Sequence, residues 1–421
     1  MNILMINQPL NNRGDESAHK ALVRRLLETD EKINITCIWV AVENTINYPN
    51  IQSYCINDSR IQYKIIKPFG VWKASVIYVR LLHLYMKTRS KWLLQFYPTF
   101  HKLLSFYKSA DIVLCAPGGI CMGGFQDWRH LFMLSLAKDI KKPLVYYGRS
   151  FGPFPEKTQA NKLFKKISLE MLDYFSFLSI RDQKTETLAK ELHIKKYFTT
   201  VDSAFLSSTH IQIPLEILNT IHTDDYIVFV PNSLIWHFAY KDKITYTTVL
   251  DFYCGLLDII LRNFPQGRIV MLPQTFGRYD KLGNDINLFN DIAEKYNDSR
   301  LIVIDDKYDS DIQQSIISKA RFVCGARYHS IVFAINQNRP FIALSYEHKI
   351  AGLLNTLNCS DNMIDITESL NSIEQIKKTY DLFENKIKNM SCNPAITRKA
   401  KEIANNCFDE LLHYLNDYRN A

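Results

Sequence analysis

Arginine, histidine and lysine side chains that could bind an anion and move a proton follow two strand-like segments in the second half of the chain. Arg327 and His329 come just after a segment that ends at Gly325, and Lys349 comes just after Phe341–Ser345. This spacing predicts one βαβ unit, so the three side chains lie at the carboxyl edge of a parallel sheet, beside helix N-termini that favour anions. A histidine that titrates near neutral pH can serve there as acid or base. The residues therefore predict an active centre for an anionic substrate.

The same residues also admit an ordinary structural interpretation. Arg327 could cap a helix or form a salt bridge, and His329 could be a buried histidine with satisfied hydrogen bonds. The glycine that ends the first strand and the lysine that follows the second favour the functional interpretation, because both suit a ligand held at strand ends.

A second group of such residues occurs in the first half of the chain. Gly118 and Gly119 follow a strand-like run and would let the backbone approach a ligand closely. Arg149 follows another strand, in a stretch too rich in Gly and Pro to be helical. Arg181 ends a third strand, and Asp182 is placed to cap the next helix. Turns and surface ion pairs are the alternative roles for these residues.

The elements that must position these residues alternate between buried strands and helices. Strand-like runs occur at 3–6, 35–40, 112–116, 144–147 and 175–180, and again at 226–230, 268–272, 301–304, 321–324 and 341–345. Helical patterns lie between most of them, as at 131–137, 248–262 and 312–319. This alternation predicts an α/β fold with parallel sheets that helices cover on both faces. We expect two Rossmann-like domains that face a cleft, at residues 1–206 and 207–375, followed by C-terminal helices at 376–421.

In their order along the chain, the motifs resemble those of the polysaccharide pyruvyl transferase family. The shared segments are Asn12-Arg13-Gly14-Asp15-Glu16, Gly118-Gly119, Gly148 to Pro153, Arg181-Asp182, Asp202-Ser203-Ala204, Gly325-x-Arg327-x-His329-Ser330 and Ser345-Tyr346-x-x-Lys349. The resemblance runs from about residue 2 to about residue 355, and its last two motifs are the most specific. It covers neither residues 59–110 nor the tail beyond 357.

The resemblance implies a GT-B-like pair of Rossmann domains that moves pyruvate from phosphoenolpyruvate to a pair of sugar hydroxyls, as a ketal, in bacterial surface polysaccharide biosynthesis. It implies that His329 is catalytic and that the donor is held by Arg181, Arg327 and Lys349. Further substrate contacts are expected from Arg149, Ser330, Gly118, Gly119 and Asp15. The acceptor would be a lipid-linked or polymeric saccharide, and neither a metal nor another cofactor is required.

Two other classes of function remain open. A nucleotide-sugar glycosyltransferase on the same architecture would use Glu347 on a ribose, and Arg327 with Lys349 on a diphosphate. A non-catalytic saccharide-binding relative would keep the fold without the reaction, because fold alone does not determine function. A bound three-carbon phosphate, a bound nucleotide, or neither would separate the three classes.

The stretch from Ser59 to Ala110 contains no Asp or Glu and is rich in aromatic residues. Its ten basic residues are Arg60, Lys64, Lys67, Lys73, Arg80, Lys87, Arg89, Lys91, Lys102 and Lys108. Basic helices with interleaved aromatics are typical of contact with an anionic membrane surface, here the inner membrane, with Lys87, Arg89 and Lys91 as its cations. The alternative is an ordinary solvated helical pair whose aromatics lie in the core.

Composition excludes several other classes of protein. The chain has 421 residues, is 47% hydrophobic and carries a net charge of +8, which fits a globular protein of two domains. No apolar run is long enough to span a bilayer, and the start lacks the pattern of a secretory signal, so we expect a cytoplasmic protein. Nine scattered cysteines indicate free thiols, and Asp305, Asp306, Asp309 and Asp311 are interpreted as solvated rather than metal-binding. No nucleic-acid partner is expected.

Overall fold

A computed structural model describes residues 1–10, 12–41, 52–70, 73–209, 211–223, 225–237, 240–275, 284–305 and 307–421. The chain divides into two compact units. Unit 1 consists of Met1–Leu10, Ala18–Leu206 and Ile403–Ala421, and unit 2 consists of Asn11–Ser17 and Ser207–Glu402. Each unit is built around one large parallel sheet.

The sheet of unit 1 has seven strands in the order β3-β2-β1-β4-β6-β8-β9. They are β1 (Asn2–Ile6), β2 (Asn34–Val40), β3 (Ile61–Ile66), β4 (Ile112–Cys115), β6 (Leu144–Tyr146), β8 (Phe177–Ile180) and β9 (Phe198–Thr199). Strand β1 pairs in parallel with β2 on one side and with β4 on the other, as expected for a buried central strand. The five apolar runs predicted as strands in this half of the chain all belong to this sheet.

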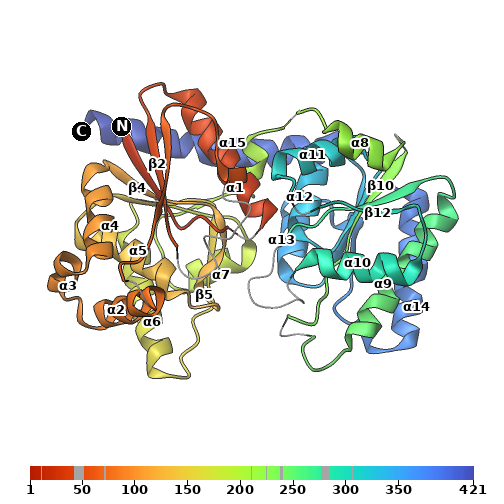
Figure 1. The fold of residues 1–421 in the computed structure, drawn as a ribbon, viewed down its shortest axis with the longest axis horizontal. Helices are drawn as coiled ribbons and strands as arrows, with labels where there is room; N and C mark the ends of the chain where they lie inside the picture. Colours follow the sequence, from red (N-terminus) through yellow and green to blue (C-terminus); the bar gives the residue numbers. More distant parts are fainter. Residues whose placement is uncertain are drawn as a thin grey trace. The chain divides into compact units, whose positions relative to one another are not determined.

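Helices lie on both sides of this sheet (Figure 1). They are α1 (Arg13–Thr29), α2 (Ala74–Thr88), α3 (Lys91–Phe96), α4 (Pro98–Ser109), α5 (Trp128–Asp139), α6 (Gln159–Tyr174) and α7 (Gln183–Glu191). The buried rings of Tyr78, Tyr85, Phe100 and Phe132 join α2, α4 and α5, with centroids 4.9 to 6.5 Å apart. Several aromatics of residues 59–110 are therefore core residues.

The composition of the basic stretch led us to expect helices, but part of it forms a strand. Residues Ile61–Ile66 form β3, an edge strand that pairs in parallel with β2 over six residues. Edge strands are exposed on one side, so charged residues such as Lys64 are common there and obscure the strand pattern. The helices of this stretch begin only at Ala74.

A second sheet of unit 1 joins β5 (Gly118–Gly123) to β7 (Arg149–Gly152) in parallel. A Cβ at Gly123 would overlap the backbone of Gly152, so the two strands approach this closely only with glycine. The Gly- and Pro-rich stretch predicted as a loop therefore contains a short strand, which brings Arg149 beside Gly118.

The sheet of unit 2 has six parallel strands in the order β12-β11-β10-β13-β14-β15. They are β10 (Tyr226–Val230), β11 (Arg268–Met271), β12 (Leu301–Val303), β13 (Val323–Gly325), β14 (Phe341–Ser345) and β15 (Met363–Asp365). The helices are α8 (Leu215–Ile221), α9 (Tyr246–Asn263), α10 (Asp285–Tyr296), α11 (Ser310–Lys319), α12 (Tyr328–Asn336), α13 (His348–Thr356) and α14 (Ile373–Asn389). The second α/β repeat predicted from the sequence is thus a second Rossmann-like unit (Figure 1).

Two helices contribute residues to both units. Helix α1 begins in unit 2 and continues in unit 1 from Ala18. Helix α15 (Pro394–Asn420) likewise begins in unit 2 and continues in unit 1 from Ile403. The sequence predicts a single domain over residues 1–206, whereas the first turn of α1 groups with the second sheet. That turn carries the motif that contains Asp15.

Candidate active site

Arg327 lies at the carboxyl edge of the unit 2 sheet, between β13 and α12. It takes the extended backbone conformation of the N-cap residue, and α12 begins at Tyr328. Its side chain forms an ion pair with Asp285, the first residue of α10, and both residues are buried. Strands β13 and β14 pair in parallel, so the βαβ unit predicted around Arg327 is present.

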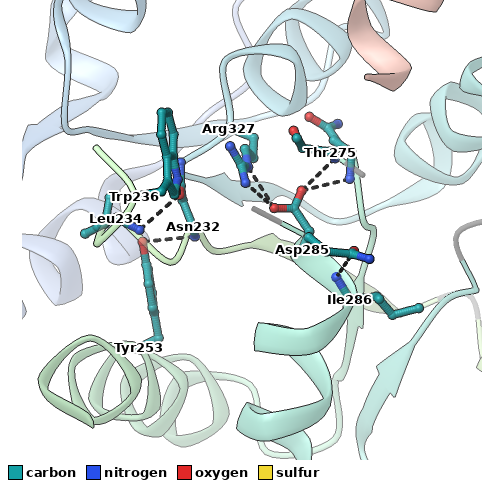
Figure 2. A network of polar contacts seen from close by, with 10 residues as sticks. Asn232, Leu234, Trp236, Tyr253, Thr275, Asp285, Ile286 and Arg327 are labelled. Carbon is teal, nitrogen blue, oxygen red and sulfur yellow. Dashed lines mark hydrogen bonds and ion pairs between the residues drawn. The ribbon is translucent and has the colours of Figure 1, made fainter. Parts of the chain in front are cut away.

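Asp285 accepts hydrogen bonds from four donors (Figure 2). Its Oδ1 accepts from Arg327 Nε at 2.9 Å and also from Arg327 Nη2. Its Oδ2 accepts from the backbone N–H groups of Gln274 at 3.0 Å and Thr275 at 2.9 Å. Burial disfavours the charged guanidinium, but the neighbouring Asp285 more than offsets this and the pKa of Arg327 is raised. The guanidinium is therefore a fixed cation, with one carboxylate already beside it.

The loop after β10 supplies an aromatic neighbour for Arg327. Asn232 Oδ1 accepts hydrogen bonds from the backbone N–H of Leu234 at 3.1 Å and from Trp236 Nε1 at 2.8 Å (Figure 2). The Trp236 ring centroid lies 5.9 Å from Arg327 Cζ, within the range of a cation–π contact. Asn232 is buried whereas Trp236 is 37% exposed, so the indole is the accessible part of this group.

His329 packs against the first turn of α1. A Cβ at Gly14 would overlap the His329 imidazole, so this approach requires glycine. Asn12 sets the turn, because its Oδ1 accepts the backbone N–H groups of Gly14 at 2.7 Å and Asp15 at 3.3 Å. Both His329 and Asp15 are less than one-tenth exposed. The motif that begins at Asn12 and the motif that ends after His329 therefore meet within unit 2.

Ser330 stabilises the turn that carries Arg327. Its Oγ donates to the backbone carbonyl of Arg327 at 2.6 Å, and its backbone N–H donates to the same carbonyl at 3.1 Å. A Cβ at Gly325 would overlap Ser330 Oγ, so the strand must end in glycine for α12 to pack here. The structure thus gives Ser330 a positioning role, and its contact with substrate stays a prediction.

Lys349 and Glu347 form a second charged group at this edge. Lys349 Nζ lies 3.3 Å from Glu347 Oε1, and His237 Nε2 lies 3.8 Å from Glu347 Oε2. Burial lowers the pKa of His237, and the charge of Lys349 adds to this effect although Glu347 opposes it. Burial therefore favours the neutral form of the His237 imidazole.

The cations of this edge do not form a bare positive cluster. Arg327 and Lys349 each have a carboxylate beside them, Asp285 and Glu347 respectively. An anion at this edge would gain from their remaining N–H donors and from the N-termini of α12 and α13, which begin next to these residues. The arrangement therefore suits an anionic ligand. His329, which could act as an acid or a base, lies two residues after Arg327 in the first turn of α12.

The other predicted arginine of the donor site belongs to unit 1. Arg181 follows β8 and forms an ion pair with Asp202, and both side chains are buried. Asp182 caps α7 as predicted, because its carboxylate accepts the backbone N–H of Thr185 at 2.8 Å. Arg181, like Arg327, thus has a carboxylate beside its guanidinium, and its role in donor binding stays a prediction.

Arg149 is fully buried in unit 1 and holds backbone segments together. Its Nη1 donates to the carbonyls of Asn7 at 2.9 Å and Ala116 at 2.8 Å, and its Nε donates to the carbonyl of Gly119 at 3.4 Å. A Cβ at Gly118 would come within 3.1 Å of Arg149 Nη2, whereas no described atom lies within 4 Å of a Cβ built at Gly119. Gly119 is thus the member of the pair with open space beside it.

The acidic residues after β12 are not all solvated. Asp309 caps α11 by accepting the backbone N–H groups of Asp311 at 3.1 Å and Ile312 at 2.9 Å. Asp311 is buried and accepts from Thr209 Oγ1 at 2.9 Å, so its interpretation as solvated is wrong. Asp306 lies outside the described residues. Within the part of the chain that the structure describes, no three His, Cys, Asp or Glu side chains gather as metal ligands.

Sequence reasoning missed four residues of this edge, namely Asn232, Trp236, Gln274 and Asp285. Asn232 and Gln274 come just after β10 and β11, so the strand-end rule that singled out Arg327 would have found them if applied to every strand. Asp285 opens a helix, and no pattern in the sequence marks it as the partner of Arg327. That pairing comes from the tertiary structure.

Solved structures with bound UDP or UDP-GlcNAc share this fold. Staphylococcus aureus MnaA, solved with UDP, has a TM-score of 0.56 at 11% identity, and the match covers 99% of this chain and 97% of MnaA. TcCGT1 in complex with UDP has a TM-score of 0.56 at 11% identity, covering 100% and 99%. UDP-GlcNAc 2-epimerase from Neisseria meningitidis, bound to UDP-GlcNAc, has a TM-score of 0.51 at 11% identity, covering 97% and 100%. At such identities the likeness shows the fold alone, and it confirms the GT-B-like α/β class.

Two comparisons concern the sequence itself. The amylovoran biosynthesis protein AmsJ of Erwinia amylovora is 24% identical over 290 residues, and the match covers 66% of this chain and 66% of AmsJ. The family model for polysaccharide pyruvyl transferase matches residues 12–348, which include the Asn12 motif and the segment around Arg327 and end one residue before Lys349. The chain therefore belongs to the polysaccharide pyruvyl transferase family.

Proposed function

We propose that the protein transfers pyruvate from phosphoenolpyruvate to two hydroxyls of a saccharide and closes them into a cyclic ketal. The observation that carries the proposal is the position of His329 against the first turn of α1, beside Arg327 at the same sheet edge. This arrangement combines an acid–base group with fixed anion-binding groups, within the residues that match the family.

Phosphoenolpyruvate bears a carboxylate and a phosphate on one carbon, and such a donor needs several N–H groups. Asp285 engages Nε and Nη2 of Arg327, which orients the planar guanidinium and leaves Nη1 for the donor. Lys349 would add a point charge at the phosphate, where the N-terminus of α13 also favours an anion. Arg181, Arg149, Ser330, Asp15 and the backbone at Gly118 and Gly119 stay candidates for further substrate contacts.

The reaction needs proton transfers that a histidine can perform. One sugar hydroxyl adds to C2 of the enol while C3 gains a proton, and the C2–O bond to phosphate then breaks. The second hydroxyl adds to C2, and the proton that it loses leaves with the phosphate. Donor and two hydroxyls thus give ketal and phosphate without an oxidant or reductant. His329 would carry one of these protons, a role typically worth about 10²–10⁴-fold in rate.

The saccharide acceptor is proposed from the family and from AmsJ, whose name links it to amylovoran biosynthesis. A lipid-linked or polymeric saccharide of the bacterial surface fits both. An assay that combines phosphoenolpyruvate with such saccharides and reads the product by mass would identify the acceptor, because pyruvate adds a fixed mass with each ketal.

Ligand protection against thermal unfolding tests the donor. A ligand that binds only the folded state stabilises it, by about 2.7 kcal/mol at 100 times its dissociation constant. Phosphoenolpyruvate should therefore raise the melting temperature, with or without a metal chelator. Lys349→Gln should weaken this protection, whereas His329→Gln should keep the protection and lose turnover.

A nucleotide-sugar glycosyltransferase is the second candidate, because Glu347 lies at the same edge and could bind a ribose. Protection by UDP-sugars and none by phosphoenolpyruvate would overturn pyruvyl transfer in favour of that candidate. Protection by saccharide alone, without turnover, would support a binding protein instead.

A further inference from the structure

Helix α2 of unit 1 exposes a row of basic and apolar side chains. Val76, Ile77 and Leu84 are 38%, 42% and 45% exposed, and Arg80 and Lys87 are exposed between and after them. Arg80 follows Val76 by four positions and Ile77 by three, and Leu84 and Lys87 continue at steps of four and three, so these residues share one face. An exposed helix face that mixes large aliphatic groups with cations is not the usual solvated surface.

The opposite face of α2 anchors the helix in unit 1. Tyr78, Leu82, Tyr85 and Met86 are each at most 1% exposed and belong to the core that covers the sheet. One side of the helix therefore packs in the core, and the apolar residues on its other side do not contribute to that packing. Val76, Ile77 and Leu84 require a different explanation.

The next helix, α3, adds exposed aromatic rings. Trp92 and Phe96 are 60% and 63% exposed and stack on each other, with ring centroids 4.6 Å apart. Phe69 is 62% exposed, and its backbone N–H donates to Oγ1 of Thr99, in the first turn of α4, at 2.7 Å. Large exposed aromatics carry a hydration cost that a partner surface would relieve.

Charge selects the kind of partner. Residues 59–110 contain no carboxylate, and Lys91, His101 and Lys108 line a hollow between α3 and α4 to which Asp139 also contributes. Arg89 is the exception, because it pairs with Asp139 at 3.2 Å and so differs from its role predicted from the sequence. The exposed surface of α2 and α3 is therefore cationic and apolar together.

We propose that α2 and α3 form a docking surface for an anionic lipid bilayer. Trp92, Phe96 and the aliphatic row would enter the headgroup region, while Arg80, Lys87 and Lys91 would lie at the level of the lipid phosphates. Within the described residues, no helix is both long and apolar enough to cross a membrane, so this contact lies at the membrane surface.

Vesicle sedimentation of the full chain tests the surface without any substrate, so its result is independent of the proposed reaction. We expect binding to vesicles of phosphatidylcholine with 30% phosphatidylglycerol, and much weaker binding to pure phosphatidylcholine, by about tenfold or more. Arg80→Gln, Lys87→Gln and Lys91→Gln together should weaken binding at least about tenfold. Trp92→Ser with Phe96→Ser should weaken it by a similar factor on both lipid compositions.

The matched control removes three exposed lysines elsewhere in unit 1, by Lys184→Gln, Lys195→Gln and Lys196→Gln. It lowers the net charge by the same amount, so it should bind anionic vesicles nearly as well as the parent chain. An equal loss in the control would reduce the effect to overall charge and overturn the proposal. Unchanged binding in the Trp92 and Phe96 variant, with an unchanged melting temperature, would also overturn it.

Discussion

Gly14 is the residue that brings the two ends of the matched region together. Its lack of a side chain lets the first turn of α1 lie against the His329 ring, where any Cβ would overlap the imidazole. The motif Asn12-Arg13-Gly14-Asp15-Glu16 is therefore part of the histidine's environment, although the sequence placed it in the other domain. At the residue scale, the position of His329 depends on the absence of a side chain at Gly14.

Gly14→Ala should displace either the imidazole or the helix turn and reduce turnover. A displacement of about 1 Å at a reacting group typically costs about 10²-fold in rate. The measurement is the rate of pyruvylated product formation, together with the protection that phosphoenolpyruvate gives against unfolding. We expect the rate to fall much more than the protection, because the atoms nearest a Cβ at Gly14 belong to His329 and not to the proposed donor-binding residues Arg327 and Lys349.

Gly352→Ala is the matched control for this substitution. Gly352 lies within α13 of the same unit, and no described atom is within 4 Å of a Cβ built there. The added methyl should leave the rate unchanged and raise the free energy of unfolding by roughly 0.5–1 kcal/mol, the usual helix preference for alanine. Equal rates for both variants would show that the Gly14 contact has no part in positioning His329.

At the element scale, strands were the most predictable feature. Buried runs such as Tyr226–Val230 are apolar along their whole length, and this pattern is distinctive of parallel sheets. Strand β3 was missed because an edge strand carries lysine, and β7 was missed because glycines that permit close pairing also suggest a loop. These misses depend on neighbours that sequence patterns do not reveal.

The candidate site, like the strands, was predicted only in part from the sequence. The sequence singled out Arg327, His329 and Lys349 through their positions after strands, and the structure places all three at one sheet edge. The sequence could not reveal that Asp285 pairs with Arg327 or that Glu347 pairs with Lys349. Ion-pair partners are set by the packing of α10 and α13, which has no periodic signature in the sequence.

Asp285→Asn should destabilise unit 2 strongly. The substitution leaves the buried Arg327 guanidinium without its carboxylate, and breaking a buried pair from one side costs about 3–5 kcal/mol. Denaturant unfolding followed by circular dichroism measures this free energy. The expected result is a lower midpoint with an unchanged slope.

Asp225→Asn provides the comparison within the same unit. Asp225 pairs with Arg321 at 3.2 Å, but both side chains are about half exposed. Exposed pairs contribute about 0–1 kcal/mol, so this variant should unfold close to the parent chain. If the two variants lost equal stability, the Arg327–Asp285 pair would be no more important to the fold than a surface ion pair.

At the scale of the whole molecule, we expect α1 and α15 to couple the unfolding of the two units. Each helix has residues in both units, and α15 buries Cys407, Phe408, Leu411 and Leu415 in unit 1. A helix that loses its packing in one unit loses hydrogen-bonded turns next to the other unit, because helix formation is cooperative. We therefore expect the chain to unfold in one transition, unlike two domains joined by a flexible linker.

Phe408→Ala tests this expectation. Phe408 is fully buried, and Arg25 Cζ lies 5.3 Å from the centroid of the Phe408 ring. Removing this ring leaves a cavity, which should lower the free energy of unfolding by about 3–5 kcal/mol. The single transition should move to lower temperature without splitting, as should the transition of Asp285→Asn in the other unit. Tyr418→Ala is the control, because Tyr418 is 39% exposed on the same helix and its loss should shift the transition little. A calorimetric trace with two peaks, of which Phe408→Ala moved only one, would show that the shared helices do not couple the units.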